Sequence, residues 1–195
     1  MYKIAVTGNI GSGKTTVCRI FEHLDIPVYY SDDEAKKFYA HQAVKNKLYR
    51  IFGEDIFTET NEIDQKKLAQ IVFNHADLLQ ELNKLIHPLV EEHFKKWCRQ
   101  YEDHFYILFE SALVYSCHLT HLFDRIIWVE APLELIVSRV MRRDKTLLEE
   151  VKRKFNLQSV PNDENIKPDY TIINDEKCLI VPQVIEIHQR LACEK

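Results

Sequence analysis

The chain has 195 residues, of which 46% are hydrophobic and 29% are charged, as in a water-soluble folded protein. Its formal net charge of −4 offers nucleic acid no overall electrostatic attraction. Its apolar runs fall short of the roughly 18 residues of a membrane helix. Five scattered cysteines without a Cys-x-x-Cys pair, and no targeting pattern, fit a reducing compartment. We therefore expect a cytoplasmic protein that binds neither nucleic acid nor membrane.

The first thirty residues predict a strand, a loop, a helix and a second strand. Residues 2–7 (YKIAVT) and 26–30 (IPVYY) are rich in strand formers, and residues 14–24 place apolar side chains at helical spacing. The loop between the first strand and the helix holds three of the protein's four glycines. This order is typical of a βαβ unit with a parallel sheet.

The glycine-rich loop predicts a phosphate-binding site, because residues 8–15 (GNIGSGKT) match the pattern G-x-x-x-x-G-K-[ST]. Glycines allow the backbone N–H groups to turn inward, and the following helix adds the positive end of its dipole. We expect Lys14 to contact the β- and γ-phosphates of ATP, and the Thr15 hydroxyl to bind Mg²⁺. The expected ATP-binding residues of this loop are Gly8, Gly11, Ser12, Gly13, Lys14, Thr15 and Thr16.

Residues 32–100 show helical patterns and no convincing strand. Residues 64–73 begin with an aspartate suited to capping, and residues 77–86 are amphipathic. We expect the pair His87-Pro88 to interrupt this second helix, with Pro88 at the first position of a new one. The pattern predicts a helical insertion over residues 32–100, between strands of the sheet.

The remaining sequence predicts three more buried strands, over residues 105–110, 125–130 and 168–174. A helix is expected after Pro132 and another over residues 181–195. Residues 139–154 carry seven Lys or Arg against three Asp or Glu, which favours a lid that closes over substrates. We expect a nucleotide-binding core formed by residues 1–31, 101–138 and 158–195, with the lid over residues 139–157.

These features favour a small-molecule kinase over a GTPase. The single glycine outside the loop, Gly53, has Arg50 three residues before it, so the Asp-x-x-Gly element of common GTPases is missing. A kinase that phosphorylates a hydroxyl benefits from a carboxylate that accepts its proton, and Asp32 follows the second strand. Ser31 and Glu34 are also spaced as a capping box, so the residues alone allow Asp32 to be either a base or a helix start.

The sequence resembles the dephospho-coenzyme A kinase family over nearly its whole length. The loop TGNIGSGKTT, the segment LNKLIHPLV, the lid-like SRVMRRD and the strand PDYTIIND all resemble motifs of that family. The family's Asp-Ala-Asp after its second strand appears as Tyr30-Ser31-Asp32, so the second aspartate is kept and the first is replaced. Ser116 and Asn165 stand where the family often has glutamate and lysine.

The resemblance implies an α/β, P-loop kinase-like three-layer fold with a five-stranded parallel sheet, a helical substrate-binding insertion and a lid. It implies transfer of the ATP γ-phosphoryl group to the ribose 3′-hydroxyl of dephospho-CoA, with Mg²⁺, as the last step of coenzyme A synthesis. Asp32 and Lys14 would be catalytic, and Asp32 and His87 would contact dephospho-CoA. Arg139 and Arg143 would bind ATP from the lid.

Alternatives remain open at this stage. The protein could be a nucleoside or nucleotide kinase, or an ATP-binding regulatory protein that transfers no phosphoryl group. Arg139 and Arg143, four residues apart on one helix face, could form only a solvated basic surface. His87 could only cap the helix that follows it. The oligomeric state is not predicted.

Overall fold

The computed structural model describes residues 1–158 and 168–193. The chain divides into two compact units, one formed by Met1–Tyr30 and Gln100–Lys195 and the other by Ser31–Arg99. Across the described residues, every helix is too short or too polar to cross a membrane. Residues 159–167, which include Asn165, lie outside the described part of the chain.

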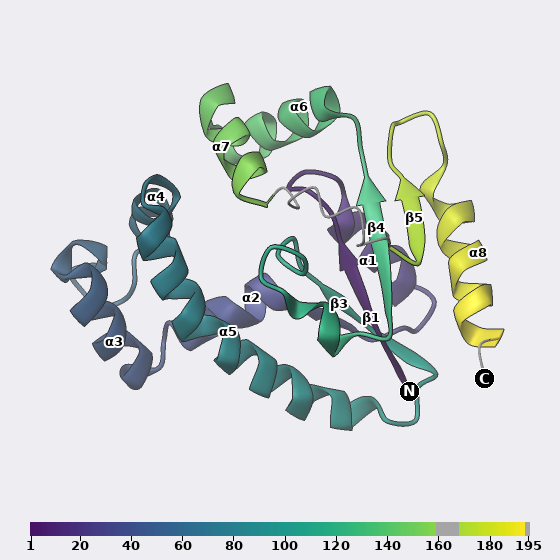
Figure 1. Ribbon diagram of the computed structural model, residues 1–195, viewed down its shortest axis with the longest axis horizontal. Helices are drawn as coiled ribbons and strands as arrows, with labels where there is room; N and C mark the ends of the chain where they lie inside the picture. The colour runs from purple at the N-terminus through teal and green to yellow at the C-terminus, as the bar shows by residue number, and fades with distance from the viewer. Residues whose placement is uncertain (159–167, 194–195) are drawn as a thin grey trace. The chain divides into compact units, whose positions relative to one another are not determined.

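The first unit is built on a five-stranded parallel sheet with the strand order β2-β3-β1-β4-β5. In this sheet Ile4 lies opposite Leu108 of one neighbouring strand and Arg125 of the other. The predicted α/β fold with a five-stranded parallel sheet is confirmed. The strands are β1 (Tyr2–Thr7), β2 (Val28–Tyr30), β3 (Tyr106–Glu110), β4 (Arg125–Glu130) and β5 (Tyr170–Ile173). Figure 1 labels β1, β3, β4 and β5.

Two helices, α1 (Lys14–Glu22) and α8 (Ile180–Cys193), pack on one face of this sheet. Their buried side chains meet Ile4, Val6 and the residues that share their face on the neighbouring strands. Because both faces of the inner strands are covered, their sequences are apolar runs rather than alternating patterns. Figure 1 shows α8 beside β5, near the end of the described chain.

Two further helices of this unit, α6 (Leu133–Asp144) and α7 (Leu148–Gln158), follow β4 and pack against each other. Val151 of α7 is fully buried and contacts the cluster formed by Ile136 and Val140 of α6. Ile10 of the glycine-rich loop packs on the same cluster. A short 3₁₀ helix, η3 (Leu119–Leu122), lies between β3 and β4.

The second unit is helical, as the sequence predicts. Asp64 caps one of its helices as expected, because its Oδ1 accepts hydrogen bonds from the backbone N–H groups of Lys66 and Lys67, at 3.0 and 3.1 Å. The elements are α2 (Ser31–Phe38), α3 (Gln42–Phe52), η1 (Glu54–Ile56), α4 (Gln65–Asn74), α5 (Ala76–Cys98) and, across the boundary between the units, η2 (Arg99–Tyr101).

The prediction that His87-Pro88 separates two helices is wrong, because α5 runs through Pro88 without ending. Proline lacks an N–H group and its ring crowds the carbonyl of the preceding turn, at a cost of about 3 kcal/mol. α5 packs against α2, α3 and α4, and a continuous buried stripe along α5 outweighs this cost. The stripe consists of Leu82, Ile86, Val90, Phe94 and Cys98.

Two buried tyrosines of the first unit differ in their hydrogen bonding. The Tyr106 hydroxyl lies 2.6 Å from His188 Nδ1, and burial raises the pKa of Tyr106, so the hydroxyl is protonated at neutral pH. The buried Tyr115 hydroxyl has no hydrogen-bond partner among residues 1–158 and 168–193. Removing a paired hydroxyl costs stability, whereas removing an unpaired one relieves a desolvation penalty.

We therefore expect Tyr106→Phe to lower the free energy of unfolding by about 1 kcal/mol, and Tyr115→Phe to leave it unchanged or raise it. Urea denaturation of the two variants beside the unmutated protein measures both changes. Equal losses in the two variants would show that the bond to His188 contributes nothing.

Candidate active site

The glycine-rich loop joins β1 to α1 at the carboxyl end of the sheet. All three of its glycines, Gly8, Gly11 and Gly13, have positive φ angles, of 143°, 76° and 100°. A Cβ atom on Gly8 would lie 2.3 Å from the Val129 carbonyl oxygen, and one on Gly13 would lie 2.1 Å from Asn174 Nδ2. Gly8 and Gly13 are therefore required both by backbone conformation and by the close approach of β4 and of Asn174, the residue after β5.

Lys14 opens α1 and is buried. Its Nζ donates hydrogen bonds to the carbonyl oxygens of Gly8 at 3.0 Å and Asn9 at 3.1 Å, which hold the ammonium group over the loop. Gly13 precedes the helix in a left-handed conformation, and no described side chain caps the helix start. The first N–H groups of α1, the helix dipole and the Lys14 charge therefore favour an anion at the same place.

Hydroxyl groups surround this loop. Thr15 and Thr16 are exposed in the first turn of α1. Thr7 and Ser12 are buried, and their hydroxyl oxygens have no hydrogen-bond partner in the described part of the chain. Buried polar groups without a partner carry a desolvation cost, and ligand binding can supply the missing bonds.

Glu110 ends β3 with a buried carboxylate, and the sequence reading did not identify it as a site residue. In the sheet it lies opposite Val6 of β1 and Tyr30 of β2. Burial is the main cause of the raised pKa of the Cys18 thiol, and the charge of Glu110 raises this pKa further. Cys18 is therefore an unreactive core residue. An apolar strand that ends in a carboxylate was the available signal, because ligands collect at this edge of a parallel sheet.

Tyr30, at a position where the resemblance implies an aspartate, lies near two carboxylates, those of Glu22 and Glu110. Burial raises the pKa of Tyr30, and a hydrogen bond to Glu22 and the charge of Glu110 raise it further. The ring also packs against the core beneath α1. A protonated hydroxyl therefore occupies a position where an aspartate would place a third negative charge near Glu22 and Glu110.

Asn174 follows β5 and contacts the phosphate loop. Like Glu110, it was not predicted from the sequence as a site residue. Its Nδ2 donates a hydrogen bond of 2.7 Å to the Ser12 carbonyl oxygen, inside the phosphate-binding pattern. Arg139, predicted to bind ATP, lies 3.3 Å from Asn174 Oδ1 and forms a 3.0 Å ion pair with Glu176. Arg139 therefore contacts the side chain of Asn174, which in turn bonds to the loop.

Arg143, the other predicted ATP-binding arginine, lies on α6 one turn beyond Arg139. It is exposed and pairs with Asp144, with distances of 2.7 Å from Nε and 3.1 Å from Nη2 to the two carboxylate oxygens. Both arginines belong to one helix, as their spacing predicts. Their contact with ATP stays a prediction.

Asp32 and His87 belong to the helical unit. Asp32 is the second residue of α2, two residues after the end of β2, and is exposed. Burial and the charge of Asp32 raise the pKa of Tyr39. Burial lowers the pKa of His87, so its imidazole is neutral at pH 7.

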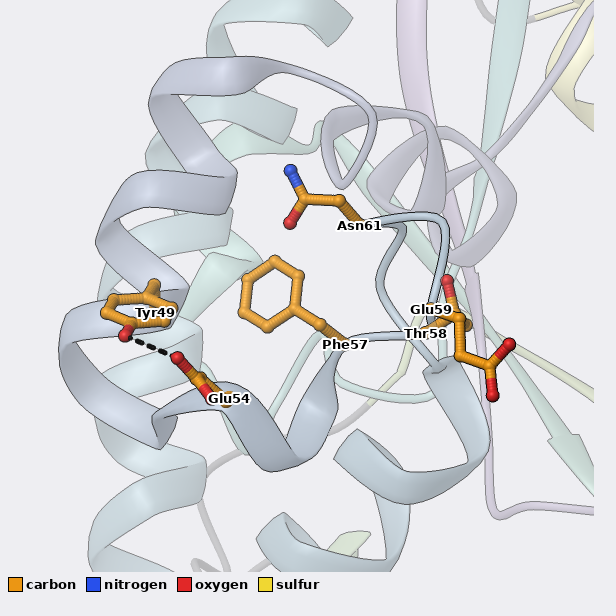
Figure 2. A pocket seen from close by; sticks show the side chains of 6 residues that line it. All are labelled: Tyr49, Glu54, Phe57, Thr58, Glu59 and Asn61. Carbon is orange, nitrogen blue, oxygen red and sulfur yellow. Dashed lines mark hydrogen bonds between the residues drawn. The ribbon is translucent and has the colours of Figure 1, made fainter.

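A pocket of about 420 Å³ lies elsewhere in the helical unit, beside the end of α3 (Figure 2). Tyr49 donates a hydrogen bond of 3.1 Å to Glu54, and its ring lies 6.0 Å from that of Phe57. Neither Asp32 nor His87 lines it, so we do not assign it to the expected substrate contacts. Its lining residues are Tyr49, Glu54, Phe57, Thr58, Glu59 and Asn61.

The close approach of Gly13 to Asn174 makes a specific prediction. We expect Gly13→Ala to weaken ATP binding about tenfold or more, since a loss of about 1.4 kcal/mol suffices for that change. The matched control is Gly53→Ala, because Gly53 also has a positive φ of 74° but would meet nothing within 4 Å. That control should lose about 1–3 kcal/mol of stability and keep its affinity for ATP. Calorimetric titration measures both affinities, and equal losses would contradict a special role for Gly13.

Comparison with known proteins agrees with this geometry. The family model described as dephospho-CoA kinase matches residues 2–179. A curated dephospho-CoA kinase of Bacteroides fragilis is 34% identical over 186 residues, covering 95% of this chain and 90% of that protein.

Two solved structures share the fold. The crystal structure of TT1252 from Thermus thermophilus has a TM-score of 0.82 and 25% identity, over 97% of this chain and 96% of that one. Dephospho-CoA kinase from Campylobacter jejuni has a TM-score of 0.61 and 23% identity, over 97% of both chains. The length of the family match and the identity to the Bacteroides fragilis protein show that the chain belongs to the dephospho-CoA kinase family.

Proposed function

We propose that the protein transfers the γ-phosphoryl group of ATP to the ribose 3′-hydroxyl of dephospho-CoA, giving CoA and ADP. Membership of the dephospho-CoA kinase family supports this assignment. The observation that carries it is the glycine-rich loop, in which Lys14, the first residue of α1, donates a hydrogen bond to the Gly8 carbonyl oxygen. The reaction would be the last step of coenzyme A synthesis.

The phosphate loop would bind the triphosphate through backbone N–H groups, with Lys14 supplying positive charge. In the transfer, the bond from the 3′-oxygen to the γ-phosphorus forms, and the bond from that phosphorus to the oxygen of the departing ADP breaks. Catalysis of such a step depends mostly on positioning and on neutralising charge. The loop is suited to both tasks because Asn174 donates a hydrogen bond to its backbone and the Val129 carbonyl of β4 lies against Gly8.

Asp32 would accept the proton of the 3′-hydroxyl as the general base. It follows β2 by two residues, and consecutive Cα atoms are about 3.8 Å apart, so the chain itself tethers it to the carboxyl end of that strand. Its position in the first turn of α2 also suits a carboxylate, because the helix dipole stabilises negative charge there. Both observations are compatible with the role that the resemblance implies.

A divalent cation, Mg²⁺, would neutralise charge on the β- and γ-phosphate oxygens when bound. The exposed Thr15 hydroxyl and the buried Glu110 carboxylate are oxygen ligands of the kind that Mg²⁺ prefers. Among the described residues no cluster of three or more His, Cys, Asp or Glu could hold a metal. Mg²⁺ at sites of phosphoryl transfer commonly binds through one or two protein groups together with substrate phosphates.

Arg139 and Arg143 would contact the phosphates of ATP from the lid, and His87 would contact dephospho-CoA. The neutral state of His87 favours a hydrogen bond to the substrate over an ion pair with it. The five cysteines are free thiols, which agrees with a reducing compartment such as the cytoplasm.

A coupled assay of ADP formation tests the function directly. With Mg-ATP, we expect ADP to form rapidly with dephospho-CoA and only slowly with adenosine or nucleoside monophosphates. Preference for one of these smaller acceptors would favour a nucleoside or nucleotide kinase. ATP binding without turnover on any acceptor would favour a regulatory protein and would overturn the proposal.

The role of Asp32 can be separated from general effects of charge on α2. We expect Asp32→Asn to keep its affinity for ATP and to lose about 100-fold or more in kcat, because it removes the proton acceptor. Asp33→Asn is the matched control, since Asp33 is the next residue and forms a surface ion pair of 2.7 Å with Lys36. Steady-state kinetics should show near-normal kcat for this control. Near-normal kcat in Asp32→Asn would leave Asp32 with a structural role at the helix start.

A further inference from the structure

The end of β5 presents a side-chain amide to the phosphate loop. Asn174 is buried, and its Nδ2 donates the 2.7 Å hydrogen bond to the Ser12 carbonyl oxygen. Its backbone N–H donates a hydrogen bond of 2.8 Å to the Glu130 carbonyl oxygen, at the end of β4. Asn174 is therefore bonded to the sheet through its backbone N–H and to the loop through its side-chain amide.

This hydrogen bond determines which way the peptide between Ser12 and Gly13 faces. The peptide is trans, so the Ser12 carbonyl and the Gly13 N–H point to opposite sides of it. Because the carbonyl faces Asn174, the N–H faces away from Asn174. A flip of this peptide would exchange the two groups and would replace a donor of the anion site with a carbonyl dipole.

We propose that Asn174 is a positioning residue that keeps the phosphate loop in its anion-binding form by fixing the peptide between Ser12 and Gly13. This inference rests on the proposed function only in that the loop binds a triphosphate. It assigns Asn174 an indirect role, since the residue acts through the loop rather than on the reacting atoms.

Arg139 sets the orientation of the Asn174 amide. Its Nη2 lies 3.3 Å from Asn174 Oδ1 and 3.0 Å from a carboxylate oxygen of Glu176. A guanidinium has only donors, so the oxygen end of the amide faces Arg139 and the NH₂ end faces Ser12. Arg139 therefore also acts on the loop through Asn174, in addition to its proposed contact with ATP.

Two substitutions test the positioning role. Asn174→Ala removes the amide, and Asn174→Asp keeps its shape but replaces the donor with an acceptor. We expect both variants to bind Mg-ATP and inorganic tripolyphosphate about tenfold more weakly, a change that corresponds to about 1.4 kcal/mol. Calorimetric titration measures both ligands, and tripolyphosphate isolates the loop because it has no base or ribose.

Gln183 provides the matched control, because it is also an amide that bonds to the β5 segment. It accepts a hydrogen bond of 2.8 Å from the Ile173 N–H and donates bonds of 3.0 Å to the carbonyl oxygens of Ile173 and Leu179. None of these bonds involves the phosphate loop. We expect Gln183→Ala to change the affinity for tripolyphosphate by less than about twofold, even if it loses stability.

Several outcomes would overturn the inference. They are unchanged affinity in both Asn174 variants, an equal loss in Gln183→Ala, and failure of both Asn174 variants to fold while Gln183→Ala folds. A second readout is kinetic: the Asn174 variants should raise the KM for ATP and leave the KM for dephospho-CoA unchanged. Arg139→Ala should also weaken tripolyphosphate binding less in the Asn174→Ala background than alone.

Failure of the proposed function would give a different result. In that case the unmutated protein would bind tripolyphosphate but would form no CoA, and the Asn174 variants would still lose affinity. The two conclusions are therefore tested by separate measurements.

Discussion

Binding a triphosphate through backbone N–H groups requires a loop whose peptides all face the right way without help from the ligand. Here the sheet imposes that arrangement. The Val129 carbonyl leaves no room for a side chain at residue 8, and Asn174 leaves none at residue 13. Lys14 adds its charge from within the loop, at 3.0 Å from the Gly8 carbonyl oxygen. Strands β1 and β4 and the residue that follows β5 thus constrain the backbone of the loop.

The sequence predicts the supporting strands well because strands covered on both faces become apolar runs that stand out from their surroundings. Residues 125–130 were predicted with the bounds that β4 has, whereas β2 is two residues shorter than predicted. The glycine pattern likewise identifies the loop, because its chemistry depends on consecutive residues. Predictions of this kind rest on local information that a sequence contains.

Features that depend on distant residues were not predicted. Glu110 is the last residue of β3 and Asn174 follows β5, but their relation to the loop depends on strand order and register. The break expected at Pro88 was wrong for a similar reason. Local chemistry favours ending a helix there, while the packing of the buried stripe of α5 against three other helices favours continuing it.

Tyr30 shows how a departure from a family motif can fit its surroundings. A second aspartate after β2 would lie near Glu22 and Glu110, and like charges in a partly buried place raise one another's pKa. The tyrosine hydroxyl instead forms a hydrogen bond with Glu22 and leaves Glu110 as the buried carboxylate at this edge of the sheet. Asp32, on the next element of the chain, is the aspartate to which the resemblance assigns the catalytic role.

The central claim, that the loop backbone binds the triphosphate, can be tested by nuclear magnetic resonance of the backbone amides. During titration with tripolyphosphate and with Mg-ATP, we expect the amide signals of Gly11, Gly13 and Lys14 to show the largest shifts, with similar changes for the two ligands. Binding that leaves these three signals in place and shifts amides of another part of the chain would contradict the claim.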